Sequence, residues 1–329
     1  MAAELDAHIS AVLQALAKGE LVPFLGAGAN LIDRPAGAVF DAERRDTLPT
    51  GSELAHHLAT EYGFVDDMKR SDDLVRVAER IRVQQGEMAV YNRLSELLDA
   101  DYPMTSLHRF IAALPAQLRS RGWKPLQLVV TTNYDDLLER AFEAAGEAVD
   151  VFVYMAAGRD HEGKFMHFPP GREPVLVQTG TANEYLLDLD ESGKYLRRPS
   201  ILKLHGTVDR KRQEHDSFVI SEDDYIDYLA RVDLPQAVPA RVRRVLAKSA
   251  YLFLGYSLKD WNVRAILREI WDATTESKGW AIQGEPSALD VSSWKSKNVD
   301  IVPARLDQYV AALSARLVAT DTTEHSNAG

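Results

Sequence analysis

Cysteine is absent from the 329 residues of this chain. Its absence excludes disulfides, thiol nucleophiles and every zinc site built from cysteine thiolates. The chain also lacks an apolar run long enough to cross a bilayer, and its first residues lack the basic, apolar and small-residue regions of a signal peptide. We therefore expect a cytoplasmic protein that does not associate with a membrane.

An excess of basic residues is missing as well. Asp and Glu outnumber Lys and Arg by 49 to 38, which gives a formal net charge of -11. Proteins that bind nucleic acids usually present a basic face to the phosphates, so direct nucleic-acid binding is not expected. The 46% hydrophobic and 26% charged composition is that of an ordinary globular protein, long enough to bury a sizeable core.

The sequence does contain a series of short apolar runs separated by helical patterns. Runs of strand length occupy residues 21–25, 126–132, 149–154, 201–204, 250–254, 279–283 and 299–302. Apolar residues recur at helical spacing over residues 5–16, 238–249 and 306–318. Continuous apolar strands are typical of parallel sheets that are covered on both faces. The pattern predicts an α/β fold with a Rossmann-like parallel sheet and helices on both faces.

We expect a single domain over residues 1–319, interrupted twice. Helical patterns dominate residues 52–122 and predict an inserted helical module, whose first helix starts at Ser52 and Glu53. Residues 155–199 are dense in Gly, Pro, His and acidic residues and predict a small irregular lid or subdomain. The loop of residues 31–50 is either a mobile lid or an ordinary surface loop. Residues 320–329 are polar and predict a flexible tail.

Three histidines lie in these interruptions. His108 is alone on a largely apolar helix, so we expect a structural role for it. His161 and His167 have no convergent carboxylates around them, so no metal site is expected there.

Four of the predicted strands end in small or polar residues. These ends are Gly26-Ala27-Gly28, Thr132-Asn133-Tyr134-Asp135, His205-Gly206 and Gly255-Tyr256-Ser257. Each has an ordinary explanation: the glycines could serve tight turns, Asp135 or Asp136 could cap a helix, His205 could be a turn residue, and Ser257 with Asp260 fits a capping pattern. In a doubly wound sheet, however, all four ends would line one crevice, where such folds bind ligands.

The segments FLGAGAN, TTNYDDLLERAF, LKLHG and FLGYSLKDWN, in this order, resemble the fingerprints of sirtuin-like domains. They are most similar to the bacterial sirtuin-like NAD hydrolases of antiphage defence. The resemblance implies NAD as substrate, Asn133 as the residue that positions ribose and water, and His205 as the catalytic histidine. It places Asp135 near the nicotinamide carboxamide. The other residues that we count as NAD-binding are Gly26, Ala27, Gly28, Asn30, Thr132, Gly255, Ser257 and Asp260.

Two departures from the family pattern refine this expectation. Deacetylases of the family bind zinc through four cysteines, which this chain does not have, so no zinc is expected and hydrolysis of NAD is favoured over deacylation. Asn30 stands where many relatives carry serine, which leaves its contact with phosphate open. The resemblance also implies a homo-oligomer and a partner such as a HerA-type ATPase, and products that are ADP-ribose or its cyclic form. A non-catalytic module that senses NAD or ADP-ribose, and a zinc-free protein deacylase, are the alternatives.

Overall fold

A central sheet organises the structure, which is a computed structural model that describes residues 2–64, 73–156, 161–178, 188–189, 195–196, 198–231, 237–256 and 279–325. In this part of the chain the sheet has nine strands in the order β13-β12-β11-β1-β2-β8-β3-β4-β5. The first seven of this order are parallel, and β4 and β5 are antiparallel. The strands are β1 (Leu21–Leu25), β2 (Leu128–Thr131), β3 (Asp150–Tyr154), β4 (Phe165–Phe168), β5 (Val175–Leu176), β8 (Ser200–Lys203), β11 (Ala250–Leu254), β12 (Gly279–Gln283) and β13 (Val299–Pro303).

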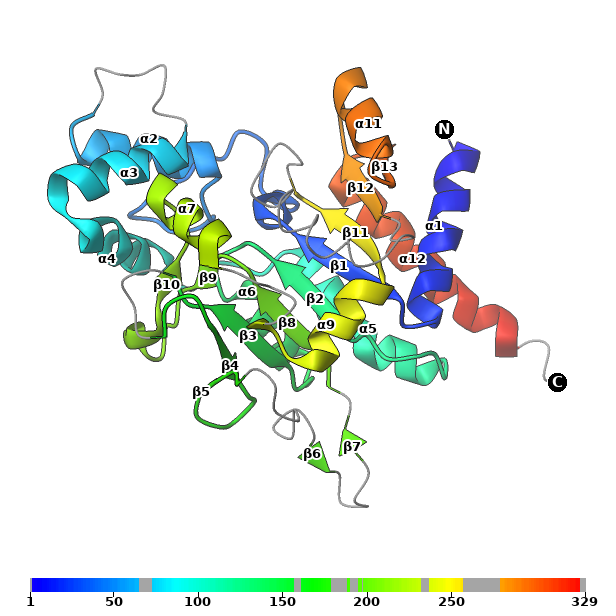
Figure 1. Cartoon of the computed structure of the whole chain (residues 1–329). Helices are drawn as coiled ribbons and strands as arrows, with labels where there is room; N and C mark the ends of the chain where they lie inside the picture. The colour runs from blue at the N-terminus through cyan, green and yellow to red at the C-terminus, as the bar shows by residue number, and fades with distance from the viewer. Residues whose placement is uncertain are drawn as a thin grey trace.

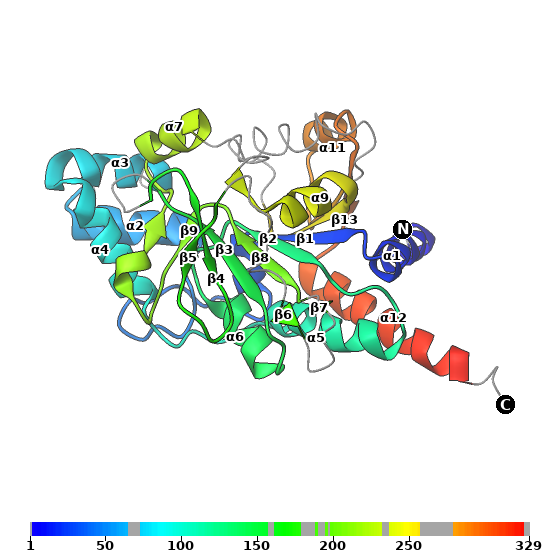
Figure 2. The same cartoon turned by 60° about the horizontal axis from the view of Figure 1, so that its bottom comes forward.

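All seven strands predicted from apolar runs are present in this sheet. Side chains alternate between its faces, so that Val22 and Phe24 of β1 join one buried cluster while Leu21 and Leu25 join another. The first cluster is covered by α7 (Glu222–Arg231), α9 (Ala240–Lys248) and α11 (Ala288–Lys295). The second is covered by α1 (Ala2–Ala17), α5 (Ser106–Ser120), α6 (Leu137–Ala144) and α12 (Leu306–His325). Figure 2 shows the two layers of helices on opposite sides of the sheet, which confirms the predicted Rossmann-like α/β fold.

The strand order places a ligand crevice at a definite position. From β1 the chain continues to β2 on one side of the sheet and reaches β11 on the other, so the order reverses between β1 and β11. In doubly wound sheets, ligands bind at the carboxyl ends of the strands next to this switch point. Leu25 and Leu254, the last residues of β1 and β11, are paired there.

The helical insertion is smaller than the sequence suggested. Three helices have a hydrophobic core of their own, at one end of the sheet in Figure 1: α2 (Gly51–Glu61), α3 (Leu74–Gln85) and α4 (Glu87–Leu98). The fourth, α5, packs on the sheet with Leu107, Ile111 and Leu114 buried. Residues 106–120 are therefore part of the main layer. The sequence could not separate them because an amphipathic pattern shows that a helix has a buried face, not which element covers it.

Other expected boundaries also differ from the structure. Helix α2 is capped by Thr50 and starts at Gly51, because Thr50 and Glu53 form a capping box. The expected irregular lid begins with β4 and β5, which extend the sheet beyond β3. Helix α12 continues to His325, since backbone hydrogen bonding does not require the apolar pattern that ends at Val318. No helix in the described ranges combines the length and apolar character needed to cross a membrane.

The remaining short elements lie directly after β1, in the second half of the expected lid, and between β8 and α7. They are the strands β6 (Asp188–Leu189), β7 (Tyr195–Leu196), β9 (Gly206–Thr207) and β10 (Ser217–Phe218), and the 3-10 helices η1 (Ala27–Leu31) and η4 (Gln213–His215).

Candidate functional site

A cleft of about 290 Å³ opens at the carboxyl ends of the central strands. Eight of the eleven predicted site residues line it, and they come from four segments that are far apart in the sequence: Ala27, Gly28, Asn30, Thr132, Asn133, Asp135, His205 and Gly255. Gly26 is buried beside the cleft. Ser257 and Asp260 lie outside the described residues. The cleft is at the lower end of the volumes typical of ligand sites.

The glycines of the first turn are required by contact between two strand ends. A Cβ on Gly28 would lie 2.7 Å from the carbonyl oxygen of Gly255, and one on Gly26 would lie 2.5 Å from the ring of Tyr256. Gly255 has a φ of +65°, and a Cβ there would lie 2.2 Å from the backbone nitrogen of Ala29. The turns after β1 and β11 therefore approach each other at backbone contact distance and form the floor of the cleft.

This contact also uses most of the amides that the sequence suggested as a phosphate cradle. The N–H of Gly26 donates to Leu254 O at 3.1 Å, that of Gly28 to Gly255 O at 2.8 Å, and that of Ala29 to Gly26 O at 2.9 Å. Ala27 is exposed and is the first residue of η1, a position whose N–H has no partner within a helix. The turn thus presents one amide to a ligand rather than a ring of them.

Asn133 is fixed by the strands on either side of it. Its backbone N–H donates to Thr131 Oγ1 at 3.0 Å, and Thr131 Oγ1 donates to Leu25 O at 3.1 Å. The side-chain Nδ2 donates to Gly26 O at 3.2 Å. Because the amide nitrogen faces the turn after β1, the side chain of Asn133 joins β2 to the floor of the cleft.

Asp135 is buried, and both of its carboxylate oxygens are engaged. Oδ1 accepts the N–H of Leu137 at 3.1 Å in the first turn of α6, and Oδ2 accepts Nδ2 of Asn30 at 2.8 Å. Asp135 thus satisfies a free amide at the start of α6 while lining the cleft. A carboxylate only accepts hydrogen bonds, so the Asn30 amide must turn its nitrogen toward Asp135. Oδ1 of Asn30 is buried and has no hydrogen-bond partner in the described part of the chain.

His205 lies immediately after β8 with 3% of its surface exposed, and it reaches the cleft wall. Two tyrosine rings pack against its imidazole nearly at right angles, Tyr225 at 5.3 Å and Tyr228 at 5.8 Å between ring centroids. Its carbonyl accepts the N–H of Val219 at 2.9 Å. The ring is therefore held in place by α7, which carries both tyrosines.

One wall of the cleft is formed by residues that no sequence motif marks. It is formed mainly by apolar residues of the helical module and the loop before it: Leu48, Pro49, Thr50, Gly51, Leu54, Leu74 and Leu98. Tyr225 and Tyr256 also line the cleft. The pattern T-x-x-E over residues 50–53 could have located the helix start, but nothing in the sequence indicates that this start faces β1.

Glu53 holds this wall in place. Its carboxylate accepts both terminal nitrogens of Arg34, at 2.8 and 2.7 Å, the N–H of Phe40 at 3.1 Å and the N–H of Thr50 at 2.8 Å. Burial alone would raise the pKa of Glu53, but the hydrogen bonds from Arg34, Thr50 and Phe40 outweigh it and lower the pKa from 4.5 to about 2. The loop that could have been a mobile lid is thus tied to α2 at its start, middle and end.

His108 has a structural role, as predicted. Its Nδ1 lies 2.8 Å from Thr105 Oγ1 and accepts the N–H of Thr105 at 3.2 Å, which completes a capping box at the start of α5. Burial lowers the pKa of His108, and the nearby Asp135 offsets part of this effect. Among the described residues, no group of three or more His, Asp and Glu side chains could hold a metal ion.

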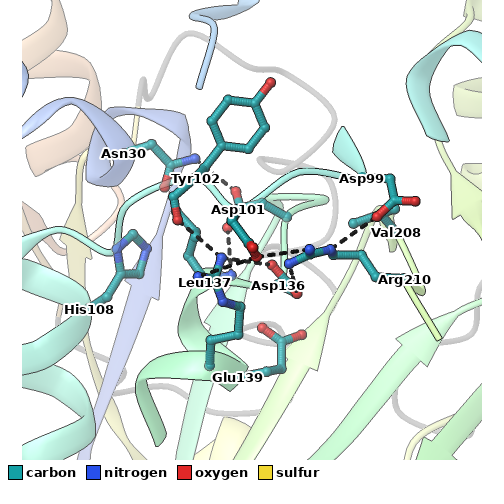
Figure 3. Close-up of polar contacts among 12 residues, drawn as sticks. Asn30, Asp99, Asp101, Tyr102, His108, Asp136, Leu137, Glu139, Val208 and Arg210 are labelled. Carbon is teal, nitrogen blue, oxygen red and sulfur yellow. Dashed lines mark hydrogen bonds and ion pairs between the residues drawn. The ribbon is translucent and has the colours of Figure 1, made fainter. Parts of the chain in front are cut away.

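An ionic network lies next to the loop that carries Asp135. Arg210 contacts Asp99 at 3.1 Å, Asp101 at 2.9 Å and Asp136 at 3.4 Å (Figure 3). Burial raises the pKa of Asp136, an effect that nearby Lys203 and Arg210 partly offset. The network joins the end of α4 and the segment after β9 to the start of α6.

Comparisons with known proteins identify the family of this chain. The sequence profile of the SIR2-like domain family matches residues 127–302, just over half of the chain. Defense-associated sirtuin 2 of Bacillus subtilis is 24% identical over 90% of this chain and 24% of its own length. NAD(+) hydrolase ThsA of Enterococcus faecium is 25% identical over 78% of this chain and 41% of its own length. This chain thus spans a quarter to two-fifths of the length of these relatives.

A solved structure from a study of the mechanism and regulation of Sir2 enzymes is similar over 95% of this chain and 98% of its own, with a TM-score of 0.40 and 14% identity.

Proposed function

This chain belongs to the SIR2-like domain family, and on that premise we propose that it is an NAD glycohydrolase that cleaves NAD to nicotinamide and ADP-ribose. Two relatives whose names describe a defence-associated sirtuin and an NAD(+) hydrolase support the proposal. We propose further that it depletes NAD in antiphage defence.

The observation that carries the proposal is the meeting of Asn133, Asp135 and His205 in one cleft beside the glycine floor. A protein that only senses a nucleotide needs the floor and an apolar wall. Sensing alone does not require a nearly buried histidine that two tyrosines hold at the cleft wall, in the same cleft as a fixed asparagine.

The chemistry requires positioning more than strong acids or bases. The nicotinamide of NAD is a cationic leaving group, so the bond to ribose breaks with oxocarbenium character and without protonation of the leaving group. Asn133 orients the ribose hydroxyls and a water molecule. His205 accepts a proton from that water as its oxygen bonds to the ribose carbon, because a neutral imidazole has one nitrogen that can accept. The balanced reaction consumes NAD and water and releases nicotinamide, ADP-ribose and one proton.

Incubation of the purified protein with NAD, with products resolved by chromatography, tests the proposal. Asn133→Ala and His205→Ala should each abolish most consumption of NAD. Asn92→Ala and His56→Ala, at exposed positions on α4 and α2, are the matched controls and should leave it intact. A wild-type protein that never consumes NAD, alone or with an activating partner, contradicts the proposal. Binding of NAD without turnover would indicate a sensing module, and turnover only with an acyl-lysine peptide would indicate a deacylase.

We propose also that assembly controls the activity, through a homo-oligomer and a partner such as a HerA-type ATPase, because an unregulated NAD hydrolase would harm its own cell. A monomer by size-exclusion chromatography that has full activity alone would contradict this.

A further inference from the structure

Lys203 is a completely buried cation that the reaction proposed above does not use. It is the last residue of β8, and its side chain has 0% of its surface exposed. Lysine is almost never fully buried unless its ammonium group is paired, because removing a charge from water is costly. Its position two residues before His205 connects it to the cleft.

Within the described ranges, the acceptors that bind the ammonium group of Lys203 all lie in the segment that follows β2. Nζ lies 2.5 Å from the carbonyl oxygen of Asp135, 3.5 Å from that of Tyr134 and 2.8 Å from Oε1 of Glu139. All three partners are acceptors, which matches the three N–H donors of a protonated lysine. The lysine thus ties the loop after β2 and the first turn of α6 to the end of β8.

That loop carries Asn133 and Asp135, whereas β8 leads into His205. Three neutral bonds also join the two segments: Leu204 N–H donates to Thr131 O at 3.0 Å, Val208 N–H to Tyr134 O at 2.8 Å, and Thr207 Oγ1 to Tyr134 O at 3.4 Å. Two bonds involve charged side chains: Arg210 pairs with Asp136 at 3.4 Å where both side chains are about a quarter exposed, and Lys203 contributes the buried charged bond. Charge-assisted hydrogen bonds are about twice as strong as neutral ones, so its loss should affect the loop most.

We infer that Lys203 is a positioning residue, which sets the placement of Asn133 and Asp135 relative to His205 by holding the carbonyls of the loop between them. The inference rests on the proposed function. It assigns a role to the lysine of the LKLHG segment, which does not line the cleft. The expected signature is a loss of turnover with little loss of ligand affinity, because the floor formed by Gly28 and Gly255 is independent of Lys203.

The test compares Glu139→Gln with Lys203→Met/Glu139→Gln. In the single variant the glutamine oxygen can still accept from Nζ and the bonds to the two carbonyls remain, so kcat for NAD should stay near the wild-type value although the protein becomes less stable. The double variant removes these bonds without leaving an unpaired buried carboxylate, so kcat should fall by about 100-fold, the cost of a small misplacement of reacting groups. Affinity for ADP-ribose, measured by calorimetry, should change by less than about threefold. If methionine prevents folding, Lys203→Gln in the same background replaces it.

Arg198→Met is the control for a general loss of stability. Arg198 pairs with the buried Asp150 at 3.0 Å, at the start of β3 and thus at the opposite end of the strands from the cleft. It should lower the melting temperature and leave kcat unchanged. A folded double variant with kcat within about threefold of wild type, or an equal loss in Arg198→Met, would overturn the inference.

Hydrogen exchange of residues 133–137 distinguishes failure of this inference from failure of the proposed function. The double variant should exchange faster there than Glu139→Gln whether or not NAD is consumed. If the wild-type protein does not consume NAD, the proposed function fails, and unchanged exchange would then refute the role of Lys203 in holding the loop.

Discussion

Replacement of Glu53 by glutamine should loosen the cleft wall and destabilise the protein. The carboxylate accepts four N–H groups from Arg34, Phe40 and Thr50. A glutamine at this position has one acceptor oxygen, and its NH₂ group would face donors that need an acceptor. The loop before α2 would lose several of its ties to the helix, so the wall that Leu48 and Pro49 form would no longer be held in place.

The magnitude follows from the pKa. A shift of the Glu53 pKa from 4.5 to about 2 corresponds to about 3 kcal/mol if it is taken in full. A quarter of the side chain is exposed, and solvent screens the interaction, so we expect Glu53→Gln to lower the free energy of unfolding by about 1–2 kcal/mol. Urea unfolding at pH 7 measures this difference, and Glu143→Gln, on the exposed side of α6, is the control.

The pH dependence of the free energy of unfolding provides a test that can refute this role of Glu53. Because the pKa of Glu53 is lower in the folded state, its stabilisation is fully present above about pH 4.5 and is lost as the pH falls toward about 2. The difference between wild type and Glu53→Gln should therefore be constant from pH 8 to about 5 and smaller at pH 3.5. A difference that is the same at pH 7 and pH 3.5, or absent at pH 7, would refute the reasoning. A rise in KM for NAD with kcat nearly unchanged should accompany the loss of stability.

Three further substitutions test other parts of the structure. Gly255→Ala should prevent stable folding or abolish NAD turnover, because the new Cβ would meet Ala29 N. Gly146→Ala is the control: its φ of +68° carries the same backbone strain but its Cβ would meet nothing, so by circular dichroism it should fold with a melting temperature lowered by that strain alone. Tyr91→Phe should lower the free energy of unfolding by about 1–3 kcal/mol in urea, because its hydroxyl donates to the buried Asp224 at 2.7 Å; no loss would mean that this bond is not stabilising. Arg210→Ala should cost less than about 1 kcal/mol and less in high salt, since its ion pairs are partly exposed, and a larger, salt-independent loss would contradict that assignment.

The strands and their ends were predictable because short stretches of neighbouring residues determine them. A run such as residues 250–254 is apolar throughout since both faces of a parallel strand are buried, and residues that follow such strands share one edge of the sheet. The apolar wall of the cleft was not predictable. The position of Leu48 depends on hydrogen bonds between Glu53 and a loop that begins near Arg34. The spacing of apolar residues in the sequence does not indicate such contacts.

The sequence also could not show what the glycines of the turn after β1 are for. Gly26 and Gly28 look the same in the sequence whether they serve a ligand or a close backbone contact. Their partner, Gly255, is more than two hundred residues away, and only the fold brings the two turns together. In the fold, the amides of Gly26, Gly28 and Ala29 donate to backbone carbonyls, so they are not available to bind a phosphate.

Glu53 and Lys203 act on different sides of the same cleft, so their effects should be separable. Glu53 bonds to the loop before α2, and Lys203 bonds to the loop after β2, with no hydrogen-bonding partner in common among the described residues. Sites without shared partners usually contribute additively. Combining Glu53→Gln with Lys203→Met/Glu139→Gln should therefore multiply the separate losses in kcat/KM, the first through KM and the second through kcat. A combined loss that differs from this product by more than about tenfold would show that wall and loop move together, and that the cleft closes as one unit.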